Sequence, residues 1–217
     1  ESKVIYNNRW QTNWSELTSI KDDLSDNILN TLKVEVNQGQ DEHVVSINPD
    51  AYELYLKAKH KFEKRETLTD TEIARGLLEK AIELDENLIS AKLLLGTTFS
   101  SVGESDKALE FYSSALNQAQ KLNDILTEGL CISKIGSIYN GKGDYKRALE
   151  YHYKALKIFE KFDSQSNIGE SYYYIGWAHQ YHTSNDKGLE YYLLSFEIYE
   201  KLDDKDGIAT SLNALGI

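Results

Sequence analysis

The sequence predicts an all-α fold, a right-handed superhelix of helix-turn-helix repeats with a short N-terminal strand-helix segment. Two observations carry this prediction. Glycines recur every 40 residues, and the segments between them place apolar residues at helical spacing. In addition, Pro49 is the single proline of the 217-residue chain, so long uninterrupted helices are allowed elsewhere.

A glycine that follows Leu or Ile defines the repeat, at Gly96, Gly136, Gly176 and Gly216. Small residues keep the same register in the second half of each unit, at positions Ala108, Ala148, Gly188, Ala115, Ala155 and Ser195. Gly and Ala inside helices make sense where two helix backbones approach closely. We therefore expect each unit to be a helical hairpin with a small-residue seam, stacked on its neighbours.

The expected turns combine glycine with a short acidic residue. Gly103 with Asp106, and Gly143 with Asp144, should each supply a break and an N-cap between two helices. An earlier hairpin should begin at Asn48-Pro49, because proline is favoured in the first turn of a helix.

These residues resemble the tetratricopeptide repeat. The family's pattern of aromatic, Gly and Ala positions is seen in Ile135-Gly136, Tyr139, Ala148, His152 and Ala155. The resemblance implies that residues 46–217 hold about four repeats plus the first helix of a fifth. The 40-residue period resembles the subclass with extended helices.

Residues 1–45 do not repeat. Val4 and Tyr6 indicate a short strand, and Leu17, Ile20 and Leu24 begin a helical apolar stripe. This order looks like the C-terminal remnant of a TolB-like domain, which precedes tetratricopeptide repeats in bacterial cyclases, protein kinases and transcriptional regulators. The resemblance implies a scaffold or sensor module of a multidomain bacterial signalling protein, and the chain is expected to be a piece of something longer.

Composition excludes several classes of partner. A formal net charge of −11 argues against nucleic-acid binding, which depends on Lys and Arg neutralising phosphates. No apolar run is long enough for direct membrane insertion. A cytoplasmic location is expected, or a periplasmic one if a membrane anchor precedes the chain. The single cysteine, Cys131, occupies a small-residue position and is expected to pack in the core.

The stretch "SYYYIGWAHQYH" at residues 171–182 is the candidate site. Tyr173, Trp177 and Tyr181 are spaced by four residues and form one helical stripe. In the family that this chain resembles, this face lines a concave groove, which should be small and polar near Leu93, Thr97, Ser133 and Ser137. The predicted peptide-binding residues are Tyr173, Trp177, Tyr181, Asn140, Gln180 and Asn213. The alternative is that the rings only pack against a neighbouring repeat.

Histidines in the same stretch do not indicate a metal site. His179 falls in the seam, where it should be a core imidazole with a satisfied nitrogen. His182 lies three residues later, but no third ligand is near, so we expect neither a metal nor a cofactor. No nucleophile or paired-carboxylate arrangement stands out, and the chain is not expected to be an enzyme.

The predicted function is protein–protein interaction, with a protein or peptide ligand held in the groove. The alternative is self-association, in which a homodimer of this chain controls an attached kinase or cyclase output domain.

Overall fold

The computed structural model describes residues 48–216, and within that range every regular element is an α-helix. The strand and helix predicted for residues 1–45 lie outside the described residues. The helices are α2 (Pro49–Glu63), α3 (Leu68–Leu84), α4 (Ile89–Ser100), α5 (Ser105–Lys121), α6 (Ile125–Gly141), α7 (Tyr145–Lys161), α8 (Gln165–His182), α9 (Asn185–Leu202) and α10 (Lys205–Leu215).

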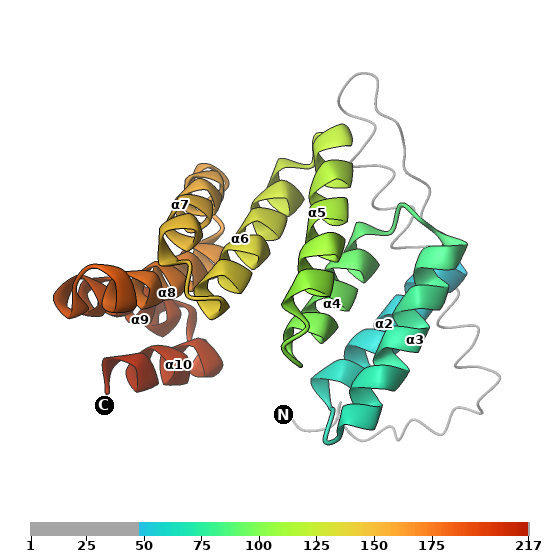
Figure 1. Ribbon diagram of the computed structural model, residues 1–217, viewed down its shortest axis with the longest axis horizontal. Helices are drawn as coiled ribbons and strands as arrows, with labels where there is room; N and C mark the ends of the chain where they lie inside the picture. The colour runs from blue at the N-terminus through green and yellow to red at the C-terminus, as the bar shows by residue number, and fades with distance from the viewer. Residues whose placement is uncertain (1–47, 217) are drawn as a thin grey trace, which may run out of the picture. The chain divides into compact units, whose positions relative to one another are not determined.

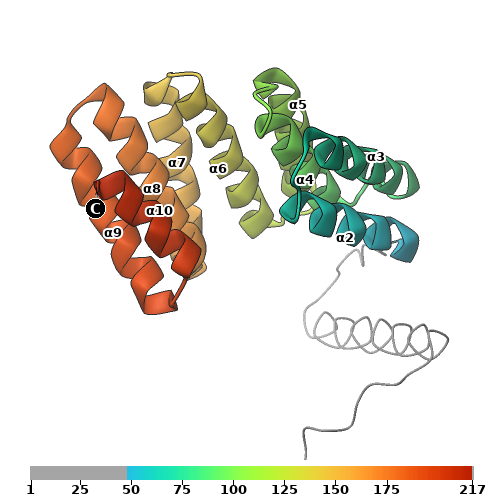
Figure 2. The ribbon, with the colours of Figure 1, turned by 90° about the horizontal axis from the view of Figure 1, so that it is seen from below.

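Consecutive helices pair as hairpins: α2 with α3, α4 with α5, α6 with α7, and α8 with α9 (Figure 1). The second helix of each hairpin packs on the first helix of the next. At the end of the stack, α10 lies against α9 and α8 (Figure 2). The second helices α5, α7 and α9 begin 40 residues apart, at Ser105, Tyr145 and Asn185. The predicted all-α superhelical repeat fold is therefore confirmed for the described part of the chain.

Side-chain caps explain where the first helices begin. Asn48 accepts hydrogen bonds from the backbone N–H groups of Asp50 and Ala51, at 3.0 and 3.3 Å, which confirms the predicted start of α2. Thr67 and Asp70 form a reciprocal capping box for α3. These short polar side chains satisfy N–H groups that have no partner inside the helix.

Glycine and aspartate form the turns within the hairpins. Gly103 and Gly143 have positive φ angles of 80° and 76°, a conformation that favours glycine. Asp144 accepts a hydrogen bond at 3.1 Å from the backbone N–H of the third residue of α7, as predicted. The prediction that Asp106 caps α5 is wrong. The equivalent of Asp144 is Glu104, whose longer carboxylate pairs with basic side chains instead.

The small-residue seam is confirmed in atomic detail. A Cβ added at Gly96 would lie 2.6 Å from the ring of Tyr112, and one at Gly136 would lie 2.9 Å from the ring of His152. Real Cβ atoms do not approach other atoms this closely, so a larger residue at either position would force the facing ring to shift. The alanines of the seam, such as Ala108, have no exposed surface.

A contact between two aromatic rings recurs in the hairpins α4–α5, α6–α7 and α8–α9, always between residues twelve apart. The stacked pairs are Phe99–Phe111 at 5.5 Å, Tyr139–Tyr151 at 5.4 Å and His179–Tyr191 at 5.4 Å between ring centroids. An imidazole thus takes the place of a benzene ring in the third pair. Both of its nitrogens have hydrogen-bonding partners, so the prediction of a satisfied core imidazole at position 179 is confirmed.

Candidate functional site

A cavity of about 460 Å³ lies between α8, α9 and α10. Four rings line it: Tyr173, Trp177 and Tyr181 from one stripe of α8, and Tyr192 from α9. The opposite wall comes from α10, which contributes Thr210, Asn213 and Ala214. The site is therefore assembled where the last described helix packs beside the aromatic stripe.

Neighbouring rings hold two of these side chains in place. Tyr181 stacks on Tyr145 at the start of α7, with centroids 5.7 Å apart and ring planes 18° from parallel. Trp177 stacks on Tyr174, with a centroid distance of 6.2 Å and an angle of 23°. Tyr181 is nonetheless 63% exposed, so most of its surface is available to a ligand.

Tyr192 forms the inner wall of the cavity. It lies 5.6 Å from Tyr173 between ring centroids, and its phenol donates a 2.8 Å hydrogen bond to Oε1 of Gln180. Burial raises the pKa of Tyr173 and of Tyr192 above the ordinary value for tyrosine. Both phenols are therefore neutral at physiological pH, and the cavity is lined by no charged side chain.

Five of the six residues predicted for the site line this cavity, namely Tyr173, Trp177, Gln180, Tyr181 and Asn213. Sequence reasoning missed Tyr192, because its register placed it in the seam beside Gly176. That position is indeed only 3% exposed, yet one edge of the ring reaches the cavity. The sequence did contain one indication of this role: Gly176, sixteen residues earlier, leaves space for a ring at position 192.

Asn140 does not belong to the cavity. It is 2% exposed, and its side-chain amide donates a 3.0 Å hydrogen bond to the backbone carbonyl of Tyr174. The same Nδ2 lies 3.4 Å from Nε2 of His152. Asn140 and Gln180 are equivalent by the 40-residue offset, and each faces the ring residue twelve positions later. In Asn140 the shorter side chain leaves the amide buried beneath α8.

The other positions predicted to line an open groove are largely occupied by internal contacts. Leu93 packs against the core, and Thr97 accepts a 3.1 Å hydrogen bond from the phenol of Tyr112. Ser133 is 2% exposed. Ser133 is thus buried, whereas Leu93 and Thr97 keep partial exposure beside their internal contacts.

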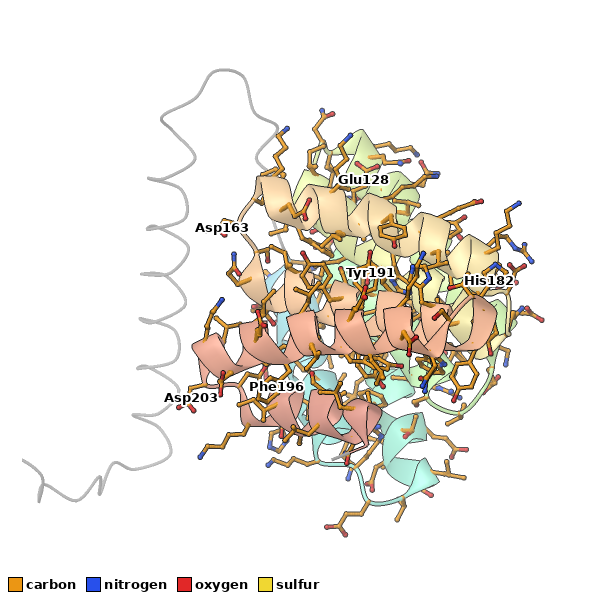
Figure 3. The ribbon with its side chains drawn as sticks, turned by 90° about the vertical axis from the view of Figure 1, so that its left-hand side faces the viewer. Glu128, Asp163, His182, Tyr191, Phe196 and Asp203 are labelled. Carbon is orange, nitrogen blue, oxygen red and sulfur yellow. The ribbon has the colours of Figure 1, made fainter. Side chains whose placement is uncertain are left out.

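A second, smaller cavity of about 290 Å³ lies among α7, α8 and α9. Its polar wall is a chain of hydrogen bonds. Nδ1 of His179 lies 2.8 Å from the hydroxyl of Thr183, and Nε2 lies 3.0 Å from the phenol of Tyr153. That phenol is 2.9 Å from the phenol of Tyr191, which Figure 3 shows on the edge of α9 nearer α7. Lys187 also lines this cavity.

Other chemistry finds no support in residues 48–216. Within that range, no three His, Cys, Asp or Glu side chains are grouped so as to hold a metal ion. None of the described helices has the length and apolar character required to cross a membrane. Cys131 has no exposed surface, and burial raises the pKa of its thiol to about 12, so it remains a packed, protonated thiol as predicted.

Comparisons with known proteins agree with this architecture. A sequence profile of the tetratricopeptide repeat matches residues 132–162. No curated protein sequence matches the chain. Residues 132–162 thus match a tetratricopeptide repeat, and they lie within a stack of helical hairpins of the same type.

Several solved structures share the fold at low sequence identity. The apo form of RapI is 18% identical with a TM-score of 0.62, over 76% of this chain and 61% of that protein. A Rap protein complexed with Competence and Sporulation Factor is 15% identical with a TM-score of 0.69, over 79% and 48%. MamA is 21% identical with a TM-score of 0.52, over 88% and 98%. This chain therefore spans less than two thirds of either Rap protein, and these likenesses establish the fold alone.

Proposed function

We propose that the chain is a protein-interaction module that binds an extended segment of a partner protein in the cavity between α8, α9 and α10. The observation that carries the proposal is the convergence of four aromatic rings on one cavity of about 460 Å³. A hollow of this size suits one or two side chains of a ligand.

The chemistry of the lining favours a peptide. Aromatic rings supply a large contact area at a small cost in conformational entropy, and here Trp177 and Tyr181 are already held by stacking. Gln180 and Asn213 offer amide groups that pair with a peptide backbone. The module itself performs no chemical step in this proposal.

We further propose that the module is the scaffold or sensor part of a bacterial signalling protein. The resemblance of residues 1–45 to a TolB-like domain supports this context. The Rap protein of similar fold was solved as a complex with Competence and Sporulation Factor, which supports a binding role for this type of helical stack.

A selection from a random twelve-residue peptide library tests the groove. The wild-type chain should enrich peptides that bind at least about tenfold more weakly to a Trp177→Ala/Tyr181→Ala variant, since interface aromatics of this kind contribute 1–2 kcal/mol or more. Phe162→Ala is the matched control, because Phe162 is 47% exposed and lies outside the cavity. The proposal would be contradicted if the enriched peptides bound the wild type and the double variant equally, or if no peptide were enriched.

Self-association is the alternative, and two adjacent exposed residues of α9 favour it. Leu193 and Leu194 are 48% and 40% exposed. A second copy of the chain would cover them in a dimer. Light scattering at increasing concentration decides between the two: a mass that doubles, and that returns to the monomer value in Leu193→Glu, supports the dimer. A constant monomer mass rules it out.

A further inference from the structure

We propose that the ligand side chain held between α8, α9 and α10 is an arginine. This inference rests on the proposed function, and it names the chemistry of the anchor. The cavity presents four aromatic rings and neutral amide groups, without a charged side chain in its lining. Such a lining accepts either an apolar group or a cation that binds to ring faces.

The rings are arranged for contact with a cation. Trp177 stacks on Tyr174 and Tyr181 stacks on Tyr145, so both rings are held in place, and both line the cavity. Tryptophan and tyrosine have the strongest attraction for cations among the aromatic side chains. Because burial keeps Tyr173 and Tyr192 in their phenol form, no nearby phenolate changes this character.

The surrounding charge distinguishes a cation from an apolar group. Between Gln165 and Leu215, which spans α8 to α10, eight acidic residues stand against three lysines and no arginine. The whole chain carries a formal net charge of −11. The resulting negative potential attracts a basic peptide and repels an acidic one.

The absence of a carboxylate from the lining favours arginine over lysine. A lysine ammonium is a compact, strongly hydrated charge that loses its water shell on entering such a hollow. A guanidinium is planar and weakly hydrated, so it can stack flat on the exposed ring of Tyr181. It also has five N–H donors, and the neutral amide oxygen of Asn213 can accept a hydrogen bond from one of them.

The probe is a set of nonapeptides, acetyl-GVSAXASVG-amide, in which X is arginine, lysine, citrulline or norleucine. Citrulline keeps the shape of arginine without its charge. Binding is followed through the indole fluorescence of Trp177 in a chain that carries Trp10→Phe and Trp14→Phe, because the sequence contains three tryptophans. The variants Tyr181→Phe and Tyr181→Leu serve as a matched pair, since Tyr181 is exposed and only the first replacement keeps an aromatic face.

We expect the arginine peptide to bind about tenfold more tightly than the citrulline peptide, the range given by a desolvated cation–π contact. Tyr181→Phe should retain that preference and Tyr181→Leu should lose it. Equal binding of the arginine, citrulline and norleucine peptides would overturn the inference while leaving the groove intact. An arginine preference that survives Tyr181→Leu would also overturn it, as would no response to any probe at millimolar concentration. If no probe gives a response, the peptide-library selection still tests separately whether the cavity binds peptides.

Discussion

The ring of Tyr192 occupies the space that a side chain at position 176 would need. A Cβ on Gly176 would lie 2.8 Å from Cδ1 of Tyr192 and 3.0 Å from the backbone oxygen of Gly188. The second contact is with main chain, so it cannot be relieved by moving a flexible side chain. Tyr192 also forms the inner wall of the aromatic cavity, and the close approach of α8 and α9 therefore positions the candidate site.

Replacing Gly176 with alanine should destabilise the fold by about 2 kcal/mol, because overpacking a tight contact outweighs the better helix propensity of alanine. Urea denaturation followed by circular dichroism measures this change. Gly76→Ala is the matched control, since a Cβ at Gly76 in α3 meets nothing within 4 Å. That variant should gain about 0.5–1 kcal/mol. If both glycines respond alike, the close contact is not what fixes position 176.

His152 should make the fold sensitive to mild acid. The imidazole has no exposed surface, and burial, with the positive charge of Lys134 as a lesser cause, lowers its pKa to about 3. In the unfolded chain a histidine titrates near 6.5. Below that pH the histidine is protonated in the unfolded state but stays neutral in the folded state. The free energy of unfolding therefore falls as the pH drops from about 6.5 towards 3, by up to about 1.4 kcal/mol per pH unit.

The variant His152→Phe isolates this effect, because phenylalanine keeps a ring against Gly136 and cannot be protonated. The free energy of unfolding, measured by urea denaturation, should fall from pH 7 to pH 5.5 by roughly 1 kcal/mol more in the wild type than in the variant. This range lies above the titration of most carboxylates. An identical pH dependence in both chains would mean that the imidazole is charged, or accessible, in the folded state.

Much of the fold was predictable from the sequence, because two helices that pack closely need small residues at the contact, and these residues recur at a fixed spacing. Gly96, Gly136 and Gly176 are the residues at this contact. The stripe of Trp177 and Tyr181 was predictable for a similar reason, since residues four apart share one face of a helix.

The role of individual polar residues was less predictable. Asn140 and Gln180 share a register position, but only Gln180 reaches the cavity. The difference depends on one methylene group and on whether the facing ring is His152 or Tyr192. Such choices follow from three-dimensional contacts between helices, and periodicity alone does not contain them.

Cys131 should resist thiol reagents in the folded chain. The side chain is fully buried, and its raised pKa of about 12 leaves almost no reactive thiolate at pH 8. Labelling by 5,5′-dithiobis(2-nitrobenzoate) should therefore be at least about a hundredfold slower than in denaturant, and its rate should follow local opening of α6. The control is Ser113→Cys, because Ser113 lies on the exposed face of α5 and a thiol there should label at once. A cysteine at Ala51 would not serve, because Ala51 is also buried. Rapid labelling of Cys131 would show that the seam beside α6 opens freely.

Removing the phenol of Tyr153 should weaken the contact between α7 and α8. This hydroxyl lies 3.0 Å from Nε2 of His179 and 2.9 Å from the phenol of Tyr191, so it joins three helices through two hydrogen bonds. Tyr153→Phe leaves the ring in place but deprives the largely buried imidazole of a partner. We expect a loss of about 1–2 kcal/mol in the free energy of unfolding, the usual range for an unpaired buried polar group.

The control for this substitution is Tyr145→Phe, which removes a phenol from the same helix while retaining the stack on Tyr181. It should change the free energy of unfolding by less than about 0.5 kcal/mol. Tyr153→Phe should also make stability more dependent on the protonation of His179, whose pKa is already lowered by burial and by the nearby charge of Lys187. A protonated imidazole needs acceptors at both nitrogens, and the phenol of Tyr153 supplies one of them. The variant should therefore lose more stability at pH 5.5 than at pH 7.5, and equal losses at the two pH values would show that His179 stays neutral throughout.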